Sequence, residues 1–128
     1  MSFLVVNLTK RLTVIGIFLC VLAAGQSVRG DSLLTMRVTP ALSFAPAVVR
    51  VRATIETATE NRFLEVSADS GNFYRSSQIQ LNGDGAPRVS VFEFRNLPAG
   101  TYAVTAVLGG ISGQRATLSR TVLVVAGN

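Results

Sequence analysis

Apolar and polar residues alternate along most of the chain from residue 34 onward. In residues 48–55 (VVRVRATI), every second position from Val49 to Ile55 is apolar, and arginine or threonine fills the positions between. Residues 63–69 (FLEVSAD) alternate in the same way, with leucine, valine and alanine in one phase. Because residues two apart in a strand share a face, both patterns predict strands with one buried side.

Short segments of this kind recur along the chain and are separated by turn residues. NGDG at 82–85 predicts a turn because Asn-Gly and Asp-Gly tolerate positive φ, and GGISG at 109–113 predicts a hairpin. The predicted strands are residues 33–39, 48–55, 63–69, 73–81, 87–94, 101–108 and 114–125. Their number and spacing predict an all-β fold, a seven-stranded antiparallel immunoglobulin-like β-sandwich over residues 34–126.

Two irregularities interrupt the alternation. Pro40 and Pro46 cannot donate an amide hydrogen to a sheet, so residues 40–47 are expected to form part of the first, edge strand. In the last strand, the apolar phase is interrupted between Leu118 and Val122. An extra residue in one strand shifts its phase, so this interruption predicts a bulge there.

The first 25 residues have the pattern of a secretory signal peptide. Two basic residues precede the apolar run 12–24, whose 13 residues are fewer than the roughly 20 that a membrane span needs. Ala23 and Gly25 are small and have the spacing of a signal-peptidase site. We therefore expect a signal peptide at 1–25, a flexible leader at 26–33, and export to the periplasm or outside the cell. The alternative is an uncleaved N-terminal anchor.

The basic residues are dispersed, although the formal net charge is +5. Beyond the predicted signal peptide all ten of them are arginine, and no two are adjacent. Nucleic-acid-binding domains gather lysine and arginine on one face or along one helix. The dispersed arginines therefore predict solvated strand faces and no nucleic-acid partner.

The segment 96–108, NLPAGTYAVTAVL, joins a tight turn to a strictly alternating strand. Pro98 fixes one φ angle and Gly100 frees another, which suits a crossing between two sheets. Leu97 follows the last alternating phenylalanine by three residues, so we expect the strand to end there and the leucine to turn into the core. Tyr102 can bury its ring just past the turn and bond its hydroxyl to nearby backbone. The predicted structural corner is Leu97, Pro98, Gly100 and Tyr102.

FRNLPAGTYAVTA resembles the corner between the fifth and sixth strands of bacterial immunoglobulin-like domains, among them fibronectin type III-like and PKD-like domains. LPAGTY is similar to the LPPGTY form of carboxypeptidase-regulatory-like domains. The resemblance covers about residues 89–108, and the Gly-rich DGxF turn of that last group is missing upstream. It implies an immunoglobulin-like sandwich that serves as an accessory, binding or spacer module.

The residue types that carry most enzymatic chemistry are missing. The chain has no histidine, and its only lysine and cysteine, Lys10 and Cys20, lie in the predicted signal peptide. Glu65 and Asp69 share a predicted face but lie about 13 Å apart, beyond the spacing of roughly 5–10 Å in glycosidases. Aspartate and asparagine in the predicted turns are explained by turn chemistry rather than by calcium binding. The sequence therefore predicts no enzyme activity, catalytic residues, metal ligands or cofactor.

Phe63, Phe73 and Tyr74 are the candidate binding residues, since they lie beside or out of phase with the predicted core. Aromatic side chains near a loop can dock a protein or stack on a sugar ring. The favoured hypothesis is a non-catalytic exported module that contacts a protein of the bacterial envelope or the exterior. The alternative is a carbohydrate-binding accessory module, with a polysaccharide as the partner. We expect no stable membrane span once the signal peptide has been removed.

We predict that the mature protein begins near Gln26, because the small-residue signal-peptidase site ends at Gly25. Intact-mass measurement of the exported protein checks this start. A mature chain that still carries Phe18 would show that the segment is retained.

Overall fold

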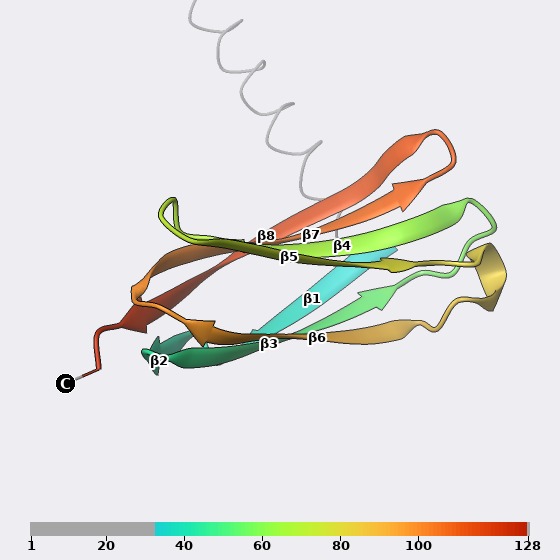
Figure 1. The fold of residues 1–128 in the computed structure, drawn as a ribbon. Coiled ribbons are helices and arrows are strands. Elements are labelled where there is room, and N and C mark those ends of the chain that lie inside the picture. Colours follow the sequence, from blue (N-terminus) through green and yellow to red (C-terminus); the bar gives the residue numbers. More distant parts are fainter. Residues whose placement is uncertain (1–32, 128) are drawn as a thin grey trace, which may run out of the picture.

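The computed structural model describes residues 33–127, which form two packed β-sheets (Figure 1). The strands are β1 (Leu34–Thr39), β2 (Leu42–Phe44), β3 (Ala47–Ile55), β4 (Asn61–Asp69), β5 (Tyr74–Gln80), β6 (Val89–Leu97), β7 (Gly100–Gly110) and β8 (Gly113–Val125). A single 3₁₀ turn, η1 (Gly83–Gly85), lies between β5 and β6. One sheet has the order β1-β3-β6, and the other has the order β2-β8-β7-β4-β5. This is an all-β sandwich with an immunoglobulin-like strand order.

The core lies between the sheets and consists of the inward-facing residues of alternating strands. β3 and β7 show the pattern most clearly, since every second residue from Val49 to Ile55 and from Tyr102 to Leu108 is buried. Burial of apolar side chains from two facing sheets is the main stabilising contribution in such a fold. The alternation in the sequence therefore places the core correctly in these strands.

The predicted strand count of seven is wrong, because the proline-bordered segment forms a separate strand. β2 pairs with β8, so it belongs to the five-stranded sheet, whereas β1 belongs to the three-stranded sheet. The register Leu42↔Leu123 is parallel, so the sandwich is not wholly antiparallel either. Pro40 separates β1 from β2, and Pro46 separates β2 from β3. A residue without an amide hydrogen interrupts a ladder, and here the chain changes sheets at that interruption.

The predicted end of the strand at 87–94 and the predicted bulge of the last strand also lie elsewhere. β6 does not end at Phe94: a bulge near Asn96, whose φ is 58°, brings Leu97 back into the core. In β8 the inward phase is constant from Ala116 to Val124, and the register shift falls at Arg115 instead. A bulge inserts one residue and so changes which face the following residues share.

The crossing from β6 to β7 is held by Tyr102. Its side chain is fully buried, and its hydroxyl donates a hydrogen bond of 2.6 Å to the carbonyl oxygen of Pro98. Leu97 is also fully buried beneath the crossing. Phe73, just before β5, packs edge-to-face on Tyr102 with ring centroids 6.5 Å apart. The corner therefore joins the β6–β7 crossing to the β4–β5 turn.

A polar cluster around the buried Asn61 closes the opposite end of the five-stranded sheet. Asn61 is fully buried, and its side-chain amide donates to the carbonyl oxygen of Glu56 at 3.0 Å. Arg115 donates to the side-chain oxygen of Asn61 and forms an ion pair of 3.4 Å with Glu60. Because a buried polar group without a partner is costly, these bonds explain how asparagine is tolerated there. They also anchor the β7–β8 hairpin, which contains the bulge at Arg115.

We predict that Tyr102→Ala is among the most destabilising single changes in the domain. It removes a fully buried ring, for which the loss is about 3–5 kcal/mol, and a hydrogen bond worth about 1 kcal/mol. Tyr102→Phe keeps the ring and is expected to lose only the hydrogen-bond contribution. Urea unfolding measures both free-energy changes.

Thr101→Ala is the matched control, because Thr101 is the preceding residue and its side chain is exposed. Its free energy of unfolding is expected to stay close to that of the parent chain. A loss as large as that of Tyr102→Ala would mean that the inward and outward faces of β7 have been assigned incorrectly.

Candidate functional site

The three aromatic candidates do not form one surface. Phe63 pairs with Gln80 and Tyr74 pairs with Asp69, so these two aromatics lie at opposite ends of the β4–β5 ladder. Six strand positions separate the two pairs, which corresponds to about 20 Å. Phe73 is half-buried against the corner.

Two of these aromatics have packing roles. The ring of Phe63 lies against Gly109 of β7, where an added Cβ would overlap the ring. Arg75 stacks over Phe73 at 5.3 Å and donates to the carbonyl oxygen of Arg95 at 3.1 Å, which bridges the two sheets. Tyr74 is 60% exposed. Of the three, Tyr74 is the residue whose ring remains available to a partner.

The outer face of β1-β3-β6 brings together arginines that are far apart in the sequence. Arg37 comes from β1, Arg50 and Arg52 come from β3, and Arg95 comes from β6. All four occupy outward positions of their strands and are exposed. We call these four residues and Glu93 the arginine face. The sequence prediction of dispersed arginines missed it, although alternation on each strand placed every one of them outward.

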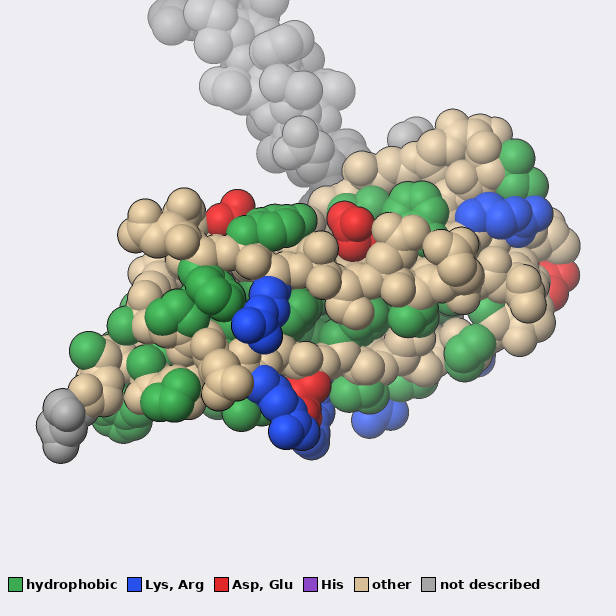
Figure 2. All heavy atoms as spheres, in the orientation of Figure 1, with side chains coloured by type: hydrophobic (Ala, Val, Ile, Leu, Met, Phe, Trp, Pro, Cys, Tyr) green, Lys and Arg blue, Asp and Glu red, His purple; other side chains and the backbone are tan. Residues whose placement is uncertain are grey.

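The arginine face carries the whole net charge of the described chain. Residues 33–127 contain nine arginines and six acidic residues, a net charge of +3. The arginine face contains four arginines and one glutamate, which is also +3, and the remaining five arginines and five acids balance. Figure 2 shows basic side chains projecting beneath β3 and β6, with one acidic group among them.

Glu93 pairs with Arg50 and Arg95, the two arginines in one half of this face. It accepts hydrogen bonds from Arg50 at 2.9 Å and from Arg95 at 2.5 Å. The hydrogen bond from Arg50, followed by the bond and the positive charge of Arg95, lowers the pKa of the Glu93 carboxyl below its ordinary value. One carboxylate is therefore shared between two guanidinium groups.

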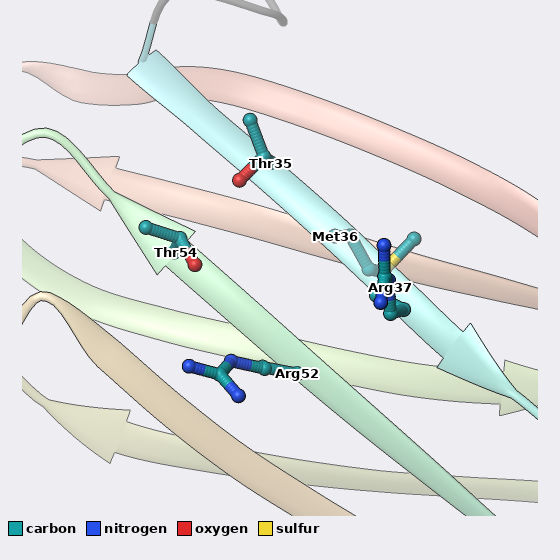
Figure 3. A pocket seen from close by; sticks show the side chains of 5 residues that line it. All are labelled: Thr35, Met36, Arg37, Arg52 and Thr54. Atoms are coloured by element: carbon teal, nitrogen blue, oxygen red, sulfur yellow. The ribbon is translucent and has the colours of Figure 1, made fainter.

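Arg37 and Arg52 form the other half, and they lie directly opposite each other in the β1–β3 register. Within residues 33–127, neither has a carboxylate within 4.0 Å. Thr35 and Thr54 are the next outward pair along the same ladder. Together with Met36, these four residues line a surface hollow of about 440 Å³. Figure 3 shows Arg37 rising from β1 and Arg52 extending away from β1, so the two guanidinium groups diverge.

Apolar side chains surround the arginines. Val48 on β3 is 47% exposed, and Val89 and Val91 on β6 are 39% and 59% exposed. In the β3–β6 register, Val91 is the direct neighbour of Arg52, and Val89 is the direct neighbour of Thr54. The outer face of the other sheet differs, since β4 presents Glu65 and Asp69 there. The outer face of β1-β3-β6 is therefore both basic and apolar.

Neither a metal centre nor a membrane-spanning helix is found in the part of the chain that the structure describes. Between residues 33 and 127, no three side chains of His, Cys, Asp or Glu are grouped so that they could hold a metal ion. In the same range, no helix has the length and hydropathy to cross a bilayer.

Solved structures with a similar fold include two redox enzymes. The superoxide reductase (neelaredoxin) of Ignicoccus hospitalis is 12% identical, with a TM-score of 0.56; the match covers 72% of this chain and 80% of that chain. The reduced superoxide reductase of Archaeoglobus fulgidus is 16% identical, with a TM-score of 0.52 and coverages of 77% and 93%. A CARDB domain from Pyrococcus furiosus is 16% identical, with coverages of 73% and 94%, but its TM-score of 0.45 is too low to carry an argument. No family model and no curated protein sequence matches this chain. At these identities, the two reductases are similar to this chain in fold alone.

We predict that Arg50→Gln and Arg95→Gln each raise the pKa of Glu93 toward its ordinary value, because each removes a hydrogen-bond donor and a positive charge. The pKa of Glu93 is lowered in the folded chain, so these ion pairs stabilise the fold at pH values above the ordinary carboxyl pKa. The contribution is lost as pH falls through the lowered value. A carboxyl ¹³C NMR titration measures the shift. Arg120→Gln is the control and is expected to leave Glu93 unchanged, because within residues 33–127 the side chain of Arg120 bonds only to the carbonyl oxygen of the neighbouring Ser119.

Proposed function

We propose that the protein is an exported, non-catalytic immunoglobulin-like module that contacts another protein in the bacterial envelope or outside the cell. Its contact surface in this proposal is the arginine face of β1-β3-β6 together with the exposed valines around it. The observation that carries the proposal is the concentration of the whole net charge of residues 33–127 on this one face.

The composition of this face supports a protein partner. Protein interfaces are enriched in arginine and depleted in lysine, glutamate and aspartate relative to the rest of a surface. The arginine face has four arginines and one glutamate, and residues 33–127 contain no lysine. Val48 and Val91 add apolar area that a partner can cover, which contributes to binding through the hydrophobic effect.

A carbohydrate-binding role has less support. Sugar recognition by stacking needs aromatic rings presented together on one surface. Phe63 and Tyr74 lie at opposite ends of the β4–β5 ladder, and Phe73 packs on Tyr102. The outward positions of β1, β3 and β6 hold arginine, threonine, valine, glutamate and asparagine, with no aromatic residue among them.

Enzymatic activity is not part of the proposal, although the similar structures include enzymes. One fold commonly supports several functions, and the residues at the site decide which chemistry is available. Residues 33–127 contain no histidine, lysine or cysteine, the side chains most often used as a base or nucleophile. The arginines of the arginine face are suited to binding anions rather than to accepting protons.

Site-specific photo-crosslinking in the producing cell tests this proposal. A photoreactive amino acid at Val91 lies beside Arg52 on the outer face of β1-β3-β6, and the same amino acid at Gln78 lies on the outer face of the five-stranded sheet. We expect one discrete, heavier adduct with a reproducible partner from position 91 and none from position 78. An adduct from position 78 alone, or no adduct from either position, would overturn the assignment of the contact surface.

A further inference from the structure

The strongest unexplained feature of the arginine face is the pairing of Arg37 with Arg52. Like charges directly opposite each other in an antiparallel ladder are destabilising. The same face shows the favourable arrangement at the Arg50–Glu93 pair, where opposite charges are in register. The β1–β3 ladder therefore tolerates a repulsive pair in a position where an acidic residue would stabilise the sheet.

The described chain does not neutralise this pair itself. Glu93 is the only acidic residue among the outward positions of β1, β3 and β6, and it is already shared by Arg50 and Arg95. Within residues 33–127, neither Arg37 nor Arg52 has a hydrogen-bonded side-chain partner. Both guanidinium groups are exposed and carry their full set of donors toward solvent.

We infer that Arg37 and Arg52 bind carboxylates of an extended acidic segment of a partner protein, so that the ligand supplies the negative charges missing from the β1–β3 ladder. This inference rests on the proposed protein-contact function and names the chemistry of the partner. A guanidinium group accommodates a carboxylate through two parallel hydrogen bonds, which gives such a pair both strength and orientation. Thr35 and Thr54 add hydroxyl donors at the next position of the same ladder.

The geometry favours two separate carboxylates over one small anion. The guanidinium groups diverge, and the space between them is an open hollow of about 440 Å³ rather than an enclosed pocket (Figure 3). In an extended peptide, alternate side chains point to one face at a separation of about 6.6–6.8 Å. A segment with acidic residues at alternate positions can therefore present one carboxylate to each of two neighbouring arginines.

The apolar neighbours of the arginines favour a peptide over an acidic polysaccharide. Val91 lies beside Arg52 in the β3–β6 register and is 59% exposed, and Val89 lies beside Thr54. Apolar side chains of a peptide can cover these valines while its carboxylates bind the arginines. A hydroxyl-rich chain of uronic acids offers the charge but not the aliphatic side chains.

The test measures binding of a synthetic peptide in which glutamate and valine alternate, with calorimetry or NMR titration as the readout. We expect the Arg37→Gln/Arg52→Gln variant to bind this peptide at least about tenfold more weakly than the parent chain, because charge-assisted hydrogen bonds are lost. The control Arg62→Gln/Arg120→Gln removes the same charge from β4 and β8 and is expected to keep most of the affinity. Binding by the parent chain is expected to weaken as salt is added.

A second measurement separates a binding role from a structural one. Because Arg37→Gln/Arg52→Gln removes a repulsive pair, its midpoint of urea unfolding is expected to equal or exceed that of the parent chain. Equal peptide affinity in both double variants would overturn the inference, as would a clear loss of stability that accounts for the weaker binding. Equal affinity for a peptide with glutamine in place of glutamate would overturn it as well.

Polygalacturonate, compared at equal carboxylate concentration, is the competing probe. Tighter, Arg37- and Arg52-dependent binding of polygalacturonate than of the peptide would overturn the assignment of a protein ligand. If the Val91 adduct persists in Arg37→Gln/Arg52→Gln, the contact surface stands and the carboxylate inference fails. If the peptide binds as expected but Val91 gives no adduct, the proposed protein-contact function fails while the anion site stands.

Discussion

The hydrogen bond from Tyr102 to the carbonyl oxygen of Pro98 fixes the place where the chain passes from one sheet to the other. Further contacts extend from this bond to the surface. Phe73 packs edge-to-face on Tyr102, Arg75 stacks over Phe73, and Arg75 donates to the carbonyl oxygen of Arg95. The side chain of Arg95 in turn donates a hydrogen bond to Glu93. The buried corner and the charged outer face of β6 are therefore parts of one contact network across the edge of the sandwich.

Much of this fold could be predicted from period-two alternation. A strand that buries one face must place apolar residues at every second position, so the inward residues of β3, β4 and β7 can be predicted from the sequence. The turn at Pro98 and Gly100, followed by Tyr102, indicated where the chain would change sheets. These features are local, because each depends on residues close together in the chain.

The features that the sequence did not reveal depend on which strands become neighbours. Nothing near Leu42 indicates that it pairs with Leu123. The phase of β6 depends on a bulge near Asn96, where β6 has one more residue than the facing part of β3. The Arg37–Arg52 pair is likewise a product of the β1–β3 register. Alternation showed that both arginines face outward, but only the pairing of the strands brings them together. It also shows that no acidic residue of the described strands is paired with either of them.

The uneven placement of charge gives the described domain a permanent electric dipole. One sheet presents an excess of three positive charges on its outer face, while the other presents Glu65 and Asp69 on the side away from it. In the field of an acidic body, such a charge distribution experiences a torque as well as an attraction, so the domain turns its β1-β3-β6 side forward before any contact forms. This effect acts over about a Debye length, about 8 Å at physiological ionic strength, and fades as salt rises. A sandwich with this charge pattern therefore approaches an acidic body with its β1-β3-β6 side first.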